Sequence, residues 1–290
     1  MEYQYVIDKI DKYLEMDEHL TPLYHYTSVY GIEGILKKRE FWVSHSDFLN
    51  DKTERKYAIN LLINILENKL EGFSGKKEWI DTILNNINDI DFPIYVLSFC
   101  QNKDSNLMWS NYSNNDGYNL VFDLSTFRTD FKILDVNVED SVATYKSKVI
   151  YDKKIHKEAI SEIADDYIEM IKNYSGIDYE SRLIKFHNLH LSFQILSAFF
   201  KDECFQQEEE HRFILVPAFA DNLAYHCRVA NGAFIPYTRI GFESNLIKGI
   251  TVGPKNKMDI SEEGLKSFLT LNGFDSKDIE IKRSNIPYRY

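Results

Sequence analysis

Residues 23–28 (LYHYTS) place a histidine and a threonine in a stretch that alternates as a β-strand would. On a strand, His25 and Thr27 would share one face, and Tyr24 and Tyr26 would share the other. A histidine beside a threonine hydroxyl at a strand end can bind a sugar hydroxyl or act as a base. The alternative is a core histidine that is satisfied by a backbone carbonyl, and this segment alone does not decide between the two.

Residues 208–212 (EEEHR) lead directly into the apolar run FILVP, and three adjacent carboxylates are unusual at a strand entrance. Alternation along a strand would place Glu208, Glu210 and Arg212 on one face. Two like charges there raise the pKa of a carboxyl group unless the arginine compensates. One glutamate would then be a structural partner of the arginine and the other would be available for chemistry. The alternative is a solvated edge strand with an ordinary ion pair.

Aromatic side chains at Trp109 and Tyr112 come just before an expected strand at residues 117–123. Aromatic faces at such a position are good stacking surfaces for a flat ring. Taken alone, they are more often plugs that fill the core. The turn at residues 48–54 (FLNDKTE) is explained by turn and helix-cap chemistry.

Metal-binding and nucleophile motifs are absent from the sequence. There is no GxSxG, no HExxH or paired-histidine spacing, and no glycine-rich phosphate loop. Asp51, Glu54, Glu208 and Glu210 could hold magnesium as in nucleases, but nothing in the sequence fixes them together. We therefore expect no metal site.

Composition and charge limit the partners and the compartment. The formal net charge of −11 over 290 residues opposes non-specific binding to nucleic acid or to anionic membranes. The acidic N-terminal segment is not a signal peptide, and no apolar run is long enough to span a bilayer. The three cysteines lack zinc-ligand spacing and fit a reducing cytosol. We expect a cytoplasmic protein without membrane association.

Strands and helices are interspersed along the chain without alternating one for one, and no glycine-rich βα turn is present. This pattern disfavours a doubly wound sheet. It predicts a single α+β domain over residues 1–290, with a curved, largely antiparallel split β-sheet. Helices are expected at 3–16, 29–38, 54–70, 76–87, 105–113 and 261–273, with a two-helix insert near 153–200. Strands are expected at 23–28, 41–45, 93–100, 117–123, 132–136, 143–151, 211–218, 225–229, 233–237, 248–253 and 279–284.

Seven short motifs follow one another in the chain from about residue 20 and cover most of it. They are LYHYTS, FLNDKTE, LSFC at 97–100, LMWSNY at 107–112 with GYNLVFD, FK at 200–201, EEEHRF at 208–213, and ITVGPK at 250–255. In this order they resemble the DUF2971 family, an uncharacterised bacterial group. The order of histidine–tyrosine, aromatics and glutamates also resembles the ADP-ribosyltransferase fold, a split curved sheet that binds NAD in a cleft.

The second resemblance implies roles for individual residues, with NAD as the substrate. His25 would bond the ribose hydroxyl of the nicotinamide nucleoside, and the backbone of Tyr26 would hold the carboxamide. Tyr112 or Trp109 would stack on the nicotinamide ring. Glu210 would bond the ribose 2′-hydroxyl and stabilise a transition state with oxocarbenium character. The choice of Glu210 over Glu208 rests on strand alternation alone.

The function expected from this resemblance is an NAD-consuming ADP-ribosyltransferase that modifies a macromolecule, protein or nucleic acid, as a toxin or a phage-defence effector. Two alternatives stay open. One is a nucleotide- or protein-binding module in a defence or stress pathway that performs no turnover. The other is a magnesium-dependent nuclease, which the acidic charge disfavours.

Overall fold

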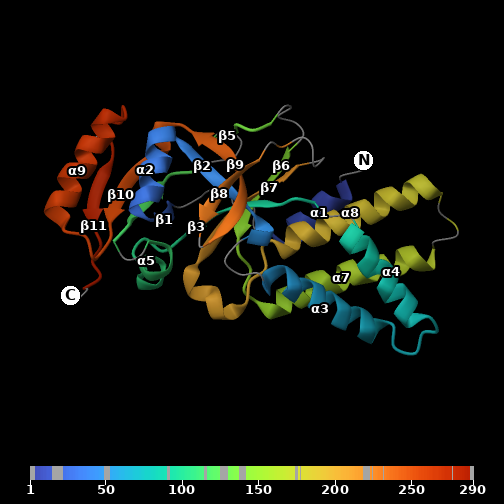
Figure 1. Cartoon of the computed structure of the whole chain (residues 1–290). Helices are drawn as coiled ribbons and strands as arrows, with labels where there is room; N and C mark the ends of the chain where they lie inside the picture. Colours follow the sequence, from blue (N-terminus) through green and yellow to red (C-terminus); the bar gives the residue numbers. More distant parts are fainter. Residues whose placement is uncertain are drawn as a thin grey trace.

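The computed structural model describes residues 4–14, 22–48, 53–89, 92–113, 116–124, 130–136, 142–173, 176, 178–217, 223, 225–230, 232–275 and 277–287 (Figure 1). The middle of the expected turn at 48–54, including Asp51, lies outside this part of the chain, as does the side chain of Glu54. None of the helices described here combines the length and the apolar character that a membrane span requires.

Within these residues, eleven strands form one mostly antiparallel sheet, and only β10 and β11 pair in parallel. The main order is β11-β10-β4-β1-β3-β2-β9-β5, while β7 pairs with β3 and β6, and β8 pairs with β9. The strands are β1 (Leu23–Thr27), β2 (Glu40–His45), β3 (Tyr95–Cys100), β4 (Tyr118–Phe122), β5 (Phe131–Ile133), β6 (Val142–Lys148), β7 (Glu210–Pro217), β8 (His226–Ala230), β9 (Ala233–Phe242), β10 (Ile247–Val252) and β11 (Glu280–Arg283).

Helices cover both faces of this sheet (Figure 1). One core joins α1, α3, α4, α7 and α8 to Val96, Ile214 and Val216 of the sheet. A second core, rich in phenylalanine, packs α2 and α9 on the opposite face. The helices are α1 (Gln4–Tyr13), α2 (Val29–Lys38), α3 (Thr53–Lys69), α4 (Lys76–Asp89), α5 (Asn106–Ser113), α7 (Lys153–Lys172), α8 (Tyr179–Ser197) and α9 (Met258–Leu271).

Local signals in the sequence explain where several helices begin. The Ser28 side chain caps α2 by accepting a hydrogen bond from Gly31 N at 3.2 Å. Asp152 and Asp178 cap α7 and α8 in the same way. The expected helices and strands are present, so the α+β class and the largely antiparallel sheet are confirmed. Their ends shift by three residues or fewer, except that β9 runs to Phe242, well beyond the expected end at residue 237.

Burial excludes the simplest arrangement of two elements. The second half of α8 is buried on every side, from Asn188 to Ser197, so it is not a surface helix with a single apolar stripe. This helix packs within the helical core and against the sheet, so it has no solvent face there. The solvated-edge alternative for β7 also fails, because β7 lies between β3 and β6 and all its residues are buried.

The two neighbours on one edge of β3 diverge, and this divergence creates the space for a site. On its first edge, β3 pairs with β7 along its whole length. On the other edge, β2 pairs only with Tyr95 and Val96, and β1 pairs only with Cys100. The edge of β3 at residues 97–99 therefore faces a gap between β1 and β2.

Candidate functional site

A pocket of about 480 Å³ lies at the divergence of β1 and β2, with walls from α2, α5 and the segment that leads into β7. Its volume is within the range of small-molecule sites. The pocket lining contains seven of the eight site residues expected from the sequence, which are His25, Tyr26, Thr27, Tyr112, Glu208, Glu210 and Arg212. Segments that are far apart in the sequence therefore meet at one cavity.

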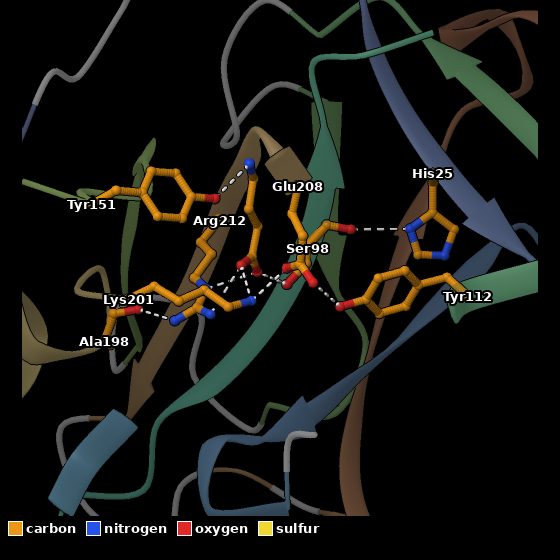
Figure 2. Close-up of polar contacts among 9 residues, drawn as sticks. His25, Ser98, Tyr112, Tyr151, Ala198, Lys201, Glu208 and Arg212 are labelled. Carbon is orange, nitrogen blue, oxygen red and sulfur yellow. Dashed lines mark hydrogen bonds and ion pairs between the residues drawn. The ribbon is translucent and has the colours of Figure 1, made fainter. Parts of the chain in front are cut away.

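Four charged side chains form a buried charge cluster at one side of this pocket, consisting of Lys201, Glu208, Glu210 and Arg212 (Figure 2). The Lys201 ammonium lies 2.6 Å from Glu208 Oε2 and 2.9 Å from Glu210 Oε2. Arg212 Nε donates to Glu210 Oε1 at 2.8 Å. Each of the four residues is less than about a tenth exposed, and the two positive and two negative charges cancel.

Glu210 has its hydrogen-bonding capacity filled by protein groups. Oε1 accepts from Ser98 Oγ at 2.5 Å and from Arg212 Nε, and Oε2 accepts from Lys201 Nζ and from Arg212 Nη2 at 3.0 Å. A carboxylate offers about four acceptor positions, and these four bonds occupy them. Burial alone would raise the pKa of Glu210, but the charges of Arg212 and Lys201 lower it to about 2.

Glu208 is held more loosely than Glu210. Its Oε1 accepts from the Tyr112 hydroxyl at 3.0 Å, and its Oε2 accepts from Lys201 at 2.6 Å. Each oxygen accepts one bond from the described residues, so the carboxylate keeps the capacity to accept a further bond from a group in the pocket. Of the two glutamates, Glu208 is therefore the one that can accept a bond from a ligand.

Strand alternation predicted that Glu208 and Glu210 share a face. The two carboxylates do converge, but strand alternation is not the cause. Glu208 ends a 3₁₀-helix over Glu203–Glu208, and β7 begins only at Glu210. Glu209 between them adopts the left-handed conformation, with φ of 45°. Lys201, which contacts both carboxylates, brings them together instead.

Lys201 was missed as a site residue by the sequence analysis, which used it only as part of a family motif. Burial alone would lower its pKa, but the carboxylates of Glu210 and Glu208 raise it above the usual lysine value. The signal in the sequence is a lysine directly after the apolar run FQILSAFF, at residues 193–200. A lysine in such a position needs an anionic partner if it is buried.

His25 faces the gap beside β3, and its hydrogen bond fixes its tautomer. Nδ1 lies 3.1 Å from the carbonyl oxygen of Ser98. A carbonyl only accepts, so Nδ1 carries the proton and Nε2 of the neutral ring is an acceptor. Phe41 and Phe99 pack against the ring edge-on, at centroid distances of 5.1 and 5.7 Å. Burial lowers the pKa of His25 to about 4, so the ring is neutral at physiological pH.

The hydrogen bond from His25 matches the core-histidine alternative raised by the sequence, yet the residue also lines the pocket. Both descriptions therefore hold for different atoms of one ring. In Figure 2, His25 and Tyr112 lie on one side of Ser98, and Lys201 and Arg212 lie on the other. The site thus combines a neutral acceptor, an aromatic ring and a compensated pair of carboxylates.

Of the two aromatic candidates for stacking, only Tyr112 lines the pocket. Trp109 has no exposed surface and packs edge-on against the Tyr26 ring at 4.8 Å. Its indole Nε1 donates to Asp104 at 2.7 Å. Trp109 is therefore a core residue that supports Tyr26, and the expectation that it stacks on a ligand is not met by its position.

Metal ligands do not gather among the described residues, where no group of three histidine, cysteine or carboxylate side chains has the spacing to hold an ion. The three cysteines are free thiols, with Cys100 buried and the other two exposed. Asp51 and the side chain of Glu54, which the nuclease alternative requires, lie outside the described structure.

Residues 108–213 match the model of a family described as "Protein of unknown function (DUF2971)". The match supports the DUF2971 resemblance predicted from the motifs, and the matched segment contains the whole buried charge cluster and Tyr112. No curated protein and no solved structure matches the chain. The resemblance to ADP-ribosyltransferases therefore stays a prediction.

Proposed function

We propose that the pocket binds NAD as a substrate and cleaves its bond to nicotinamide, transferring ADP-ribose to a macromolecular acceptor. The observation that carries the proposal is the convergence of His25, Tyr112 and two glutamates on one cavity. These groups come from β1, α5 and the residues at and just before the start of β7, which are separated by almost ninety residues or more in the sequence. A neutral acceptor, an aromatic ring and a carboxylate are the groups needed to hold a nicotinamide riboside.

Each binding role follows from the contacts of the side chain. The Nε2 atom of His25 would accept a hydrogen bond from a ribose hydroxyl, because Nδ1 is committed to Ser98. The Tyr112 ring would lie against the nicotinamide, with its hydroxyl already held by Glu208. The Tyr26 hydroxyl donates to Asn102 O at 2.8 Å. The backbone of Tyr26 would meet the carboxamide, as the resemblance to ADP-ribosyltransferases implies.

The two glutamates exchange the roles that strand alternation gave them. Glu210 accepts four bonds from protein donors and positions Arg212 and Lys201. Glu208 retains acceptor capacity and would bond the ribose 2′-hydroxyl. A hydrogen bond from that hydroxyl to a carboxylate strengthens as positive charge develops on the ribose ring.

The reaction breaks the bond between ribose C1′ and the nicotinamide nitrogen. The bonding electron pair leaves with the nitrogen, so the positively charged pyridinium departs as neutral nicotinamide and the ribose becomes an oxocarbenium-like cation. A nucleophile on the acceptor then forms a bond to C1′ and loses its proton to solvent. Because Lys201 and Arg212 balance the carboxylates, the stabilisation depends on the direct bond from Glu208 rather than on a net negative field.

The release of nicotinamide from NAD, followed by chromatography, tests this proposal. We expect release by the wild type, and a loss of roughly one hundredfold in Glu208→Gln, in line with removal of one transition-state hydrogen bond. Glu262→Gln is the matched control, because Glu262 pairs with Lys266 on α9 and does not line the pocket. Equal rates in the wild type and Glu208→Gln would refute the proposed role of Glu208, and no release with any acceptor would refute turnover.

A non-catalytic nucleotide-binding module is the second candidate, and one observation favours it. Glu210 is fully engaged and His25 has a pKa of about 4, so neither is a good general base near neutral pH. This candidate predicts that NAD raises the melting temperature without being consumed. At a concentration one hundred times Kd the stabilisation would be about 2.7 kcal/mol.

A further inference from the structure

The pocket contains a second arginine, Arg228 on β8, that the function described above does not use. In the sheet, β3, β2 and β9 separate β8 from β7, which carries Arg212. The two strands are therefore four positions apart in the sheet. Arg228 therefore reaches the pocket from a different side than the buried charge cluster.

The other charges that line the pocket are balanced by neighbours. Glu208 and Glu210 are balanced by Lys201 and Arg212. The remaining carboxylate of the lining, Glu40, lies 3.6 Å from Lys38 and 3.8 Å from Arg239 (atoms Oε1 and Oε2, respectively).

Arg228 lacks such a balancing group. No carboxylate of the described residues forms an ion pair with it, and its one hydrogen bond within them runs from Nη2 to Ser44 Oγ at 3.1 Å. Its Nε is buried and has no hydrogen-bond partner among the described residues. Burial lowers the pKa of Arg228, and the nearby Tyr237 acts in the opposite direction.

A partly buried guanidinium without an anion is costly unless a ligand supplies the anion. Arginine presents donors in a planar fork that matches the oxygens of a phosphoryl group. We propose that Arg228, assisted by Ser44, is the subsite that binds a phosphoryl group of the ligand in this pocket. The ligand is then a nucleotide rather than a nucleoside. This assignment rests on the proposed function for the identity of the whole ligand, but the anion site itself is independent of turnover.

Isothermal titration of the full chain with ADP, pyrophosphate and adenosine tests the assignment. We expect ADP to bind the wild type at least about tenfold more tightly than adenosine, as one charge-assisted hydrogen bond predicts. Arg228→Gln should lose this preference, while adenosine affinity stays the same. Arg283→Gln is the matched control, because Arg283 is exposed on β11 and does not line the pocket.

Circular dichroism establishes that each variant is folded, and Arg228→Lys provides a second variant that keeps the charge but loses the fork. We expect Arg228→Lys to bind ADP with an affinity between those of the wild type and Arg228→Gln. Equal ADP affinities in the wild type and folded Arg228→Gln would overturn the assignment, as would a wild type that binds none of the phosphorylated probes. ADP binding that depends on Arg228 without nicotinamide release from NAD would leave the subsite standing and refute the transferase.

Discussion

Replacing Glu210 by glutamine removes the negative charge that holds Lys201 and Arg212 together. The substitution keeps the size of the side chain, but its amide group would turn hydrogens toward donors of Ser98, Lys201 or Arg212. Two buried cations would also lose part of their compensation. We therefore expect a large loss of stability from a change that leaves the volume of the core unaltered.

The pKa of Glu210 gives the size of this loss. It is about 2 in the folded protein against 4.5 for an ordinary glutamate, and each pKa unit corresponds to about 1.36 kcal/mol. The charge thus contributes about 3 kcal/mol to the free energy of unfolding at pH 7, in agreement with the cost of breaking a buried ion pair. The side chain is only 8% exposed, so solvent screens little of this contribution.

The lowered pKa of Glu210 also determines how this contribution to stability depends on pH. Folding lowers the pKa of Glu210, so its contribution is fully present above pH 4.5 and is lost as the pH falls toward 2. The difference in free energy of unfolding between the wild type and Glu210→Gln should therefore be constant from pH 5 to 8. It should shrink below pH 4.5.

Urea denaturation of both proteins, followed by circular dichroism at several pH values, measures this difference. Glu262→Gln serves as the control, because its partner Lys266 is half exposed and such a surface pair contributes well under 1 kcal/mol. A denaturation midpoint of Glu210→Gln equal to that of Glu262→Gln would refute the claim that the charge cluster supports the fold.

Two further outcomes follow from the burial of titratable groups. The His25 ring should show no titration between pH 5 and 8 in NMR spectra, because its pKa is lowered to about 4. As the pH drops, the unfolded chain binds the proton first, so His25 lowers the free energy of unfolding between about pH 6.5 and 4. A titration midpoint of His25 near 6.5 would contradict this. A thiol reagent should modify Cys204 and Cys227 in the native protein and should reach Cys100 only after unfolding. Cys100 is fully buried, and burial raises its pKa to about 12. Rapid modification of all three thiols would contradict this prediction and would show that the region around Cys100 opens.

The sequence predicted the elements of this fold well because their local signals agree with the final packing. The side chains that cap α2, α7 and α8 stand at the positions where these helices begin. The mostly apolar run at residues 93–100 became β3, which is buried on both faces. Propensity, periodicity and caps are local properties, and tertiary contacts reinforce them here.

The composition of the site was predicted only in part, because the missing information is not local. In the sequence, Lys201 is simply a lysine that follows an apolar run. Its role in the site depends on the carboxylates of Glu208 and Glu210, which lie on either side of the turn at Glu209. Trp109 and Tyr112 lie three positions apart on α5, and only the packing of Tyr26 shows which of them faces the pocket. Side-chain direction across elements is a tertiary property that alternation along one strand does not contain.

The most direct test of the proposed function is a crystal structure of the Glu208→Gln variant with NAD bound. The nicotinamide ring should lie against Tyr112, with a ribose hydroxyl within about 3 Å of the Nε2 atom of His25. The phosphates should lie on the Arg228 side of the pocket. NAD bound elsewhere on the protein, or an empty pocket at saturating NAD, would contradict the account.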